Sequence, residues 1–206
     1  MIVAVGIAAA LAVALVAASV LSARGDDDDD GGGGGSAIAG SADVEAMLEG
    51  IPQDGTVLGE PDAPVTLIEY ADLQCPFCAD WARETLPVLV ADYVREGQLK
   101  IEFRGLTFIG PESEDALRSA LGAGEQGKLW NVVDLVYVNQ GAENSGWVTE
   151  DFLRSVGEAV PGLDVERMLA DAGSEGTTAA IDEAAEAATA SGVDATPTFE
   201  IGETGG

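Results

Sequence analysis

The spacing of apolar residues changes along the chain, and these changes predict the order of strands and helices. Residues 64–70 are rich in β-branched side chains, which predicts a strand. Apolar residues then recur at helical spacing over residues 76–95, where Pro87 should kink the helix or remove one of its hydrogen bonds. Gly97 ends this helix, and residues 99–104 predict a second strand. A strand, a helix and a strand in this order begin a parallel α/β unit.

A long helical stretch separates this unit from a returning strand. Residues 112–190 carry helical spacing almost throughout, with Thr149 as an expected N-cap and Gly192 ending the last helix. Residues 196–201 then return to the pattern of a strand. A short helix is also expected at residues 43–49, before the first strand. The helices of the long stretch are expected at residues 113–123, 126–139, 149–160, 164–172 and 177–190.

The first residues have a different character from the rest. Residues 2–23 carry no charge and consist almost entirely of Ala, Val, Leu and Ile. Their length fits a membrane-spanning helix, for which about 20 apolar residues suffice. The alternative is a cleaved signal peptide, whose apolar region is usually about 7–15 residues long. Residues 1–24 are therefore expected to be a transmembrane anchor or a signal segment.

A linker is expected between this segment and the folded part. Residues 25–42 contain a run of aspartates at 26–30, a run of glycines at 31–35 and then small residues. Such a composition cannot bury a core and stays flexible. The expected organisation is thus residues 1–24, a linker over residues 25–42 and one globular domain over residues 43–206.

Composition excludes several classes of function. The net charge of −28, from 37 acidic and 9 basic residues, argues against nucleic-acid binding, because phosphate backbones attract basic surfaces. The chain contains no histidine, which removes the usual general base of hydrolytic and nucleophilic enzymes. The glycine run belongs to the linker and does not follow a strand, so it does not indicate a nucleotide site.

The chemistry is concentrated in the only two cysteines, Cys75 and Cys78, which enclose Pro76 and Phe77. A C-x-x-C motif between a strand and a helix is typical of a dithiol that cycles with a disulfide. Pro76 suits the first turn of a helix, which would leave Cys75 at the helix N-terminus. The helix dipole and the free backbone N–H groups stabilise a thiolate there. Redox chemistry is the favoured interpretation.

Two other interpretations of the cysteines remain open. A zinc site needs a full set of Cys or His ligands, and the chain offers no histidine and no third cysteine. Two chains would have to share the metal, or carboxylates would have to complete the site. Alternatively, both thiols are structural and unreactive. We expect no metal and no cofactor. Two cysteines confined to one motif suit an oxidising compartment, which places the globular domain outside the cytoplasmic membrane.

Three separated features resemble the DsbA-like branch of the thioredoxin superfamily, over about residues 59–201. The first is the predicted strand and the sequence that leads from it into the C-x-x-C motif. The second is the helical stretch at residues 112–190, inserted between the second strand and the returning strand. The third is Ala-Thr-Pro-Thr-Phe at residues 195–199, which looks like the cis-proline loop of the family. The resemblance implies an α/β thioredoxin fold with an inserted all-helical subdomain.

The resemblance also implies roles for the motif residues. Cys75 would be the more exposed sulfur and the nucleophile, and Cys78 would resolve the mixed disulfide. A cis Pro197 would bring the Thr196 backbone beside Cys75, where it could pair with an extended substrate. Without the cysteines, Pro197 would be read as an ordinary trans turn proline. Pro76 and Phe77 would complete the substrate-binding surface.

Glu69 is the third candidate catalytic residue. In DsbA-like proteins, a buried glutamate at this spacing before the motif is thought to accept or relay the Cys78 proton, and burial would raise its pKa accordingly. The alternation of a strand could instead point Glu69 to solvent. Lys100 or Arg104 on the next strand is a candidate basic partner. Asp72 is expected to be a turn or cap residue.

The chain departs from the family pattern in two respects. Strongly oxidising members carry a histidine where this chain has Phe77, so we expect a reduction potential between the extremes of the superfamily. A thioredoxin-type sheet normally continues past the cis-proline strand with one more strand and a helix. The chain ends at Gly206, so a C-terminal hairpin and helix are expected to be missing and the strand at 198–201 to have an unpaired edge.

These observations predict a membrane-tethered, single-pass, extracytoplasmic thiol-disulfide oxidoreductase that forms or exchanges disulfides in exported proteins. A membrane redox partner, either a quinone-linked oxidase or a thiol relay, would complete its cycle. If residues 2–23 are a cleaved signal, the protein would be secreted or periplasmic. The alternative functions are a reductase of the same fold and a redox-inactive binding module.

Overall fold

A mixed sheet lies at the centre of the fold. The computed structural model describes residues 37–205, and within them five strands occur in the order β1-β2-β4-β3-β5. β3 pairs in parallel with β4 and antiparallel with β5, so the predicted parallel unit and returning strand are both confirmed. The strands are β1 (Gln53–Asp54), β2 (Val57–Leu58), β3 (Val65–Ala71), β4 (Leu99–Gly105) and β5 (Thr198–Glu203).

The expected membrane or signal segment, residues 1–24, lies outside the described residues, as does most of the expected linker. Among residues 37–205, no helix has both the length and the apolar character needed to cross a membrane. β5 forms one edge of the described sheet, with β3 as its neighbour.

The hairpin formed by β1 and β2 is the one part of the sheet that the sequence pattern does not reveal. Each strand has two residues, which is too short to display an alternating pattern. The turn between them contains Gly55, whose φ of 55° lies in the left-handed region that glycine adopts most readily. β2 extends the sheet by pairing with Ile101 and Glu102 of β4.

The alternation of side chains gives the sheet two different faces. Leu67 on β3 and Ile101 and Phe103 on β4 point into the main hydrophobic core. Tyr70 points to the opposite face, where it packs in a smaller cluster with Ala188 of helix α9 (Glu175–Ser191). The parallel register of β3 and β4 places Glu69 opposite Phe103. Glu69 therefore lies on the face of the main core.

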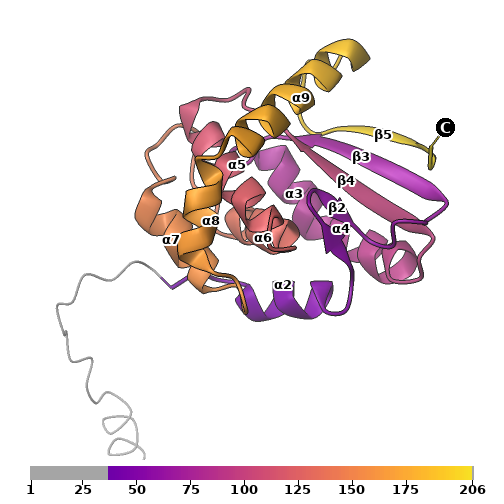
Figure 1. Ribbon diagram of the computed structural model, residues 1–206, viewed down its shortest axis with the longest axis horizontal. Coiled ribbons are helices and arrows are strands. Elements are labelled where there is room, and N and C mark those ends of the chain that lie inside the picture. Colours follow the sequence, from indigo (N-terminus) through magenta and orange to yellow (C-terminus); the bar gives the residue numbers. More distant parts are fainter. Residues whose placement is uncertain (1–36, 206) are drawn as a thin grey trace, which may run out of the picture. The chain divides into compact units, whose positions relative to one another are not determined.

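The expected helical stretch is present and packs mainly against the core face. Figure 1 shows α5, α6, α7 and α8 gathered on one side of the described fold and β5 on the other side. α6 is buried almost throughout, and its Trp130 contacts Phe103 edge-on with ring centroids 5.9 Å apart. The helices of this stretch are α5 (Pro111–Gly124), α6 (Leu129–Val138), α7 (Glu150–Glu158), α8 (Val165–Ala172) and α9, and the short helix before the sheet is α2 (Ser41–Leu48).

The helix expected at residues 76–95 is interrupted, as Pro87 predicted. It divides into α3 (Pro76–Glu84), α4 (Leu86–Leu89) and a π-helical turn, η1 (Val90–Val94). Pro87 has no N–H group to continue the helical hydrogen bonds of α3. The π turn closes with a bond from the Arg95 N–H to the Val90 carbonyl at 3.0 Å. The extra residue of a π turn rotates the helix faces, and Tyr93 is exposed although its sequence spacing resembles that of core residues.

Side-chain caps fix where the later helices begin. The Thr149 hydroxyl accepts a hydrogen bond from the Phe152 N–H at 3.1 Å, so the predicted N-cap is confirmed. Ser174 caps α9 in the same way, accepting from the Thr177 N–H at 3.0 Å. Gly192, with a φ of 70°, ends α9 as expected.

The contact between α5 and α8 generates a test of the packing. A Cβ atom placed on Gly122 of α5 would lie 2.2 Å from the Met168 carbonyl oxygen, which belongs to the backbone and cannot move aside alone. Gly122→Ala should therefore lower the free energy of unfolding by about 1–3 kcal/mol, although alanine is the better helix former. Urea unfolding of the full chain in detergent would measure this difference.

Gly176 on α9 provides the matched control. A Cβ atom there would meet only the Ser174 hydroxyl at 3.6 Å, an ordinary contact. Gly176→Ala should leave stability unchanged or raise it by up to about 1 kcal/mol, since alanine has the higher helix propensity. Equal effects of the two substitutions would contradict the close packing of α5 on α8.

Candidate active site

The C-x-x-C motif lies at the junction between β3 and α3. Cys75 is the N-cap of α3, and Pro76 occupies the first helical turn. The Cys75 Sγ accepts a hydrogen bond from the Cys78 backbone N–H at 3.4 Å. Both cysteines are free thiols. The free N–H groups at the start of α3 thus point toward the Cys75 sulfur, where they can stabilise a developing thiolate.

The loop that contains Pro197 lies directly beside Cys75. The peptide bond between Thr196 and Pro197 is cis. The Cys75 thiol donates a hydrogen bond to the Thr196 carbonyl oxygen at 3.3 Å, across 121 residues of sequence. The sheet explains this proximity, because Tyr70 near the end of β3 pairs with Thr198 at the start of β5. The loop after β3 and the loop before β5 therefore meet at the same end of these two strands.

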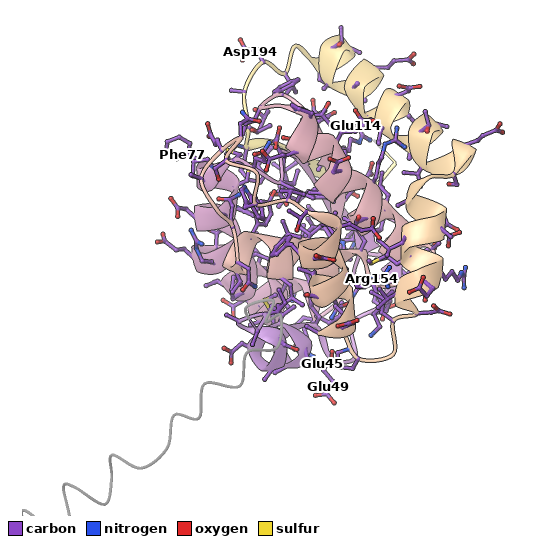
Figure 2. The ribbon with its side chains drawn as sticks, turned by 90° about the vertical axis from the view of Figure 1, so that its left-hand side faces the viewer. Glu45, Glu49, Phe77, Glu114, Arg154 and Asp194 are labelled. Carbon is purple, nitrogen blue, oxygen red and sulfur yellow. The ribbon has the colours of Figure 1, made fainter. Side chains whose placement is uncertain are left out.

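The exposure of the motif residues differs from one to the next. Phe77 is 68% exposed and projects from the surface (Figure 2). Cys75 is 3% exposed and Cys78 0%, so Cys75 is the more exposed cysteine, although both are nearly covered in this dithiol state. The Thr196 carbonyl lies against the Cys75 sulfur. Phe199 on β5 packs on Trp81 of α3, with ring centroids 5.0 Å apart, and this contact ties the Pro197 loop to the helix.

Asp72 shapes the loop that enters the motif, as expected of a turn residue. Its carboxylate accepts hydrogen bonds from the Gln74 N–H at 2.8 Å and from the Ile109 N–H at 3.0 Å. Its backbone carbonyl accepts a bond from the Tyr137 hydroxyl at 3.3 Å. Asp72 is fully buried, and these donors satisfy it.

Gln140, just after α6, supports the same loop and was not identified from the sequence. Its side-chain amide donates to the carbonyls of Leu73 at 2.9 Å and Cys75 at 3.2 Å. Together with Tyr137, it joins the inserted helices to the backbone that leads into the motif, up to Cys75. A polar residue at the end of an apolar helix gives no sequence signal of this kind, because its partners are fixed only by the tertiary structure.

Cys78 lies deeper than Cys75 and is fully buried on α3. Burial raises the pKa of its thiol well above the ordinary value, and the neighbouring Cys75 and Glu69 raise that pKa further. Cys78 therefore remains protonated at neutral pH in the dithiol state. A group that takes its proton is required before it can attack a disulfide.

Glu69 on β3 carries a buried carboxyl group, which lies on the face of the sheet that packs against the main core. It is 1% exposed, which decides between the two orientations that the sequence left open. Its Oε1 atom has no hydrogen-bond partner among the described residues. Burial raises the pKa of Glu69 well above its ordinary value, and the charge of Asp134 raises it further. Burial thus favours the protonated form of Glu69, and this form can exchange a proton.

The prediction that Lys100 or Arg104 is the basic partner of Glu69 is wrong. The Lys100 ammonium donates to the Pro61 carbonyl at 2.8 Å. Arg104 pairs with Glu102 at 2.7 Å and donates to the Tyr70 hydroxyl at 2.9 Å. The register explains this result, because Glu69 pairs with Phe103 and both basic residues belong to the alternate positions of β4. They therefore lie on the opposite face of the sheet from Glu69.

Asp134 on α6 is a second buried carboxyl group and was not identified from the sequence. It is 3% exposed, and neither of its oxygens has a hydrogen-bond partner among the described residues. Burial raises its pKa to about 8. The available signal was an acidic residue surrounded by apolar ones, in the run Val132-Val133-Asp134-Leu135-Val136. Within residues 37–205, no group of three or more Cys, His, Asp or Glu residues is arranged to hold a metal ion.

Comparison with known proteins identifies the family. A family model described as thioredoxin matches residues 52–205, which is most of the chain. The chain belongs to the thioredoxin family. The inserted helices between β4 and β5 distinguish it from a minimal thioredoxin sheet and agree with the DsbA-like resemblance inferred from the sequence.

Individual relatives of this thioredoxin-family chain point to the same branch. It is 36% identical over 117 residues to the probable disulfide bond formation protein D of Bacillus cereus, covering 55% of this chain and 54% of that protein. It is 25% identical over 152 residues to disulfide bond formation protein D of Bacillus subtilis, covering 71% and 67%. The chain thus spans about half the length of the first of these relatives.

A solved structure confirms the fold. The crystal structure of oxidised BdbD from Bacillus subtilis superimposes with a TM-score of 0.65 and 22% sequence identity, covering 73% of this chain and 85% of that one. The α/β thioredoxin fold with a helical insertion, predicted from the sequence, is therefore confirmed.

The raised pKa of Glu69 predicts how stability depends on pH. The folded state holds the Glu69 proton more tightly than the unfolded state, so unfolding becomes easier as pH rises above the ordinary glutamate pKa of about 4.5. Glu69→Gln should remove this contribution. Between pH 5 and 7, the decline of the unfolding free energy with pH should lessen by up to about 1.4 kcal/mol per pH unit. Urea unfolding at several pH values would measure the slope.

Glu49→Gln is the control for this measurement. Glu49 is exposed and extends from the surface at the end of α2 (Figure 2), so its substitution should leave the slope unchanged. A Glu69→Gln protein with the same slope as the original chain would contradict the buried, protonated state of Glu69.

Proposed function

We propose that the chain is a thiol-disulfide oxidoreductase that uses Cys75 and Cys78 on exported proteins. The observation that carries this proposal is the position of the Cys75 sulfur, between the N-terminus of α3 and the Thr196 carbonyl beside a cis proline. A sulfur placed there can form a thiolate and can meet a substrate held by the adjacent backbone. The names of the relatives, disulfide bond formation proteins, support the same activity.

The two cysteines have different tasks in the proposed exchange. Cys75 forms the mixed disulfide with substrate, because it lies at the helix N-terminus and next to the exposed Phe77. Cys78 forms or breaks the internal disulfide, and its buried thiol must lose or gain a proton as it does so. Glu69, buried on the same face of the sheet, is the group proposed to exchange that proton.

The substrate is proposed to lie as an extended peptide across the Pro197 loop. Thr196 and Pro197 would supply the backbone edge, and Pro76 and Phe77 would contact the side chains near the substrate cysteine. The exposure of Phe77 supports an apolar contact with substrates that expose unpaired or mispaired cysteines.

The placement of the protein is part of the proposal. Residues 1–24 are proposed to anchor the chain in the membrane, and residues 25–42 to let the domain at 43–206 reach substrates outside it. Electrons would pass to or from a membrane partner, either a quinone-linked oxidase or a thiol relay. If residues 1–24 are removed as a signal, the domain would act as a secreted or periplasmic protein.

The reduction potential of the Cys75–Cys78 pair decides the direction of electron flow. Phe77 cannot donate a hydrogen bond to the Cys75 thiolate, so we expect a potential between the strongly oxidising and strongly reducing ends of the superfamily. Equilibration of the full chain in glutathione buffers would measure it. A value of about −120 to −180 mV would mark a disulfide donor, and one near about −270 mV would mark a reductant. The absence of a reversible couple would favour the redox-inactive binding module.

Substitution of each cysteine separates their proposed tasks. Cys78→Ser should accumulate a mixed disulfide between Cys75 and a cysteine-containing substrate, because no resolving thiol remains. Cys75→Ser should form none and should lose all exchange activity. Non-reducing gels of the two variants after incubation with a peptide disulfide would show the difference. Trapping by Cys75→Ser instead of Cys78→Ser would reverse the assignment.

The proposed anchor is tested by whether residues 1–24 bind membranes and whether they are retained in the protein. The full chain should float with lipid vesicles on a density gradient, and a chain lacking residues 1–24 should remain with the soluble proteins. The intact mass of the protein isolated from producing bacteria distinguishes a retained anchor from a removed signal. A full chain that does not associate with vesicles would contradict membrane tethering.

A further inference from the structure

Asp134 has no part in the exchange as described so far, yet it is buried beside the groups that do. It projects from α6, a helix that packs on the face of the sheet where Glu69 lies. Trp130, one turn before Asp134, contacts Phe103, which is the cross-strand partner of Glu69. Tyr137, one turn after it, donates to the Asp72 carbonyl in the loop before the motif. Asp134 therefore lies on α6 between two contacts. One is to the cross-strand partner of Glu69, and the other is to the loop before Cys75.

The hydrogen bonding of the two carboxyl groups is incomplete. Among the described residues, no partner meets Glu69 Oε1 or either oxygen of Asp134. Buried polar groups without partners are costly, and in native proteins they often mark functional sites. Asp72 gives the contrast, since its buried carboxylate is bonded by two backbone N–H groups and has a structural task. Glu69 and Asp134 have no such structural bonds.

Asp134 also reaches a pocket that leads to solvent. A cavity of about 350 Å³ is lined by residues of α2, α3 and α6 and by Pro87, and Asp134 forms part of its wall. Asp43 and Arg83, both exposed, also line it, so the cavity opens to the surface. The remaining wall is largely apolar, with Val44, Met47, Ala82 and Val138. Asp134 is the buried acid among its lining residues, and Glu69 and Cys78 are not among them.

We propose that Asp134 is the outer carboxyl group of a proton relay that connects Cys78, through Glu69, with solvent in this pocket. The inference rests on the proposed oxidoreductase function and adds to it a residue and an exit for the proton. The charge of Asp134 raises the pKa of Glu69, which supports the proximity of the two acids. Burial raises the pKa of Asp134 to about 8, so this acid can release and take up a proton near neutral pH.

The proton balance of the step is as follows for a substrate disulfide. The Cys75 thiolate attacks one substrate sulfur, forms a mixed disulfide and releases the other substrate sulfur as a thiolate. The Cys78 thiol then gives its proton to the relay, attacks the Cys75 sulfur and forms the Cys75–Cys78 disulfide. The second substrate sulfur leaves as a thiolate, so the substrate gains two electrons and the protein loses them. Asp134 releases its proton to solvent and takes the proton of Glu69, and Glu69 then takes the proton of Cys78, so one proton leaves and both acids end the step protonated. The same path serves the reverse reaction.

In the described part of the chain, charged groups approach Asp134 from α2, α3 and β3. Arg83 on α3 lies at the pocket, but its guanidinium donates to the Tyr137 carbonyl at 3.3 Å and pairs with Asp80 at 2.8 Å. Asp43 on α2 lines the same pocket, and Glu69 on β3 faces Asp134 from the interior. Burial alone accounts for the raised pKa of Asp134. The relay should therefore show a pH dependence that changes when either buried acid is removed.

The test measures the second step of exchange separately from the first. The reduced full chain in detergent is mixed with a peptide disulfide, and acid-quenched samples give the rates of mixed-disulfide formation and resolution by mass spectrometry. Asp134→Asn should leave formation unchanged and slow resolution about tenfold at neutral pH, less than the loss of ~10²-fold or more expected of a direct acid–base group. Glu69→Gln with Asp134→Asn should resolve no more slowly than Glu69→Gln alone, since both act on one path.

A second measurement does not depend on activity. Carbon-13 NMR of the Glu69 carboxyl should show its pKa falling in Asp134→Asn, because the neighbouring negative charge is removed. Asp182→Asn is the control, since Asp182 is exposed on α9 at the opposite face of the sheet, and both measurements should match the original chain. Asp134→Ser, which is smaller and also lacks the carboxyl group, replaces Asp134→Asn if the latter fails to fold.

The outcomes separate this inference from the proposed function. Unchanged resolution together with an unchanged Glu69 titration would overturn the relay while leaving the oxidoreductase function intact. Additive slowing in the double variant would likewise overturn it, because two independent effects do not describe one path. If the original chain forms no mixed disulfide at all, the proposed function itself fails.

Discussion

The position of β3 between β4 and β5 is the constraint on which the candidate site depends. β3 runs parallel to β4 and antiparallel to β5, so its carboxyl end meets the start of β5. The loop that leads from β3 into α3 carries Cys75, and the loop that enters β5 carries Thr196 and Pro197. Residues far apart in the sequence therefore meet in a contact of 3.3 Å between the Cys75 sulfur and the Thr196 carbonyl.

The inserted helices take a direct part in this site. α6 and the residues after it place three side chains beneath the motif. The Tyr137 hydroxyl bonds the Asp72 carbonyl, the Gln140 amide bonds the carbonyls of Leu73 and Cys75, and Asp134 lies near Glu69. Residues three or four apart lie on one side of a helix, so α6 can direct neighbouring side chains toward the same site. The insertion thus fixes the backbone of the loop that leads to Cys75 and supplies a buried acid.

The two buried acids are unfavourable for the free energy of folding. Transferring a carboxylate from water into an apolar interior is unfavourable, so such a group holds its proton at higher pH. Glu69 and Asp134 both follow this rule, and among residues 37–205 neither has a basic partner to offset the cost. An apolar residue at either position would be expected to pack at lower cost. Under the proposed function, the acids are kept because a buried thiol such as Cys78 can exchange its proton only with a nearby group.

The sequence alone determined the elements that have a local cause. β-branched content predicted β3, Pro87 predicted the interruption after α3, and Thr149 and Gly192 predicted a helix start and a helix end. The C-x-x-C motif with its preceding strand, the helical stretch at residues 112–190 and the residues around Pro197 predicted the fold through their resemblance to DsbA-like proteins. Tertiary structure alone decided which side of the sheet each polar residue faces. The register of β3 with β4 turned Glu69 inward and placed Lys100 and Arg104 on the other face, and the packing of α6 buried Asp134. Strand alternation allows either orientation, and only the pairing of strands and helices far apart in the sequence selects one.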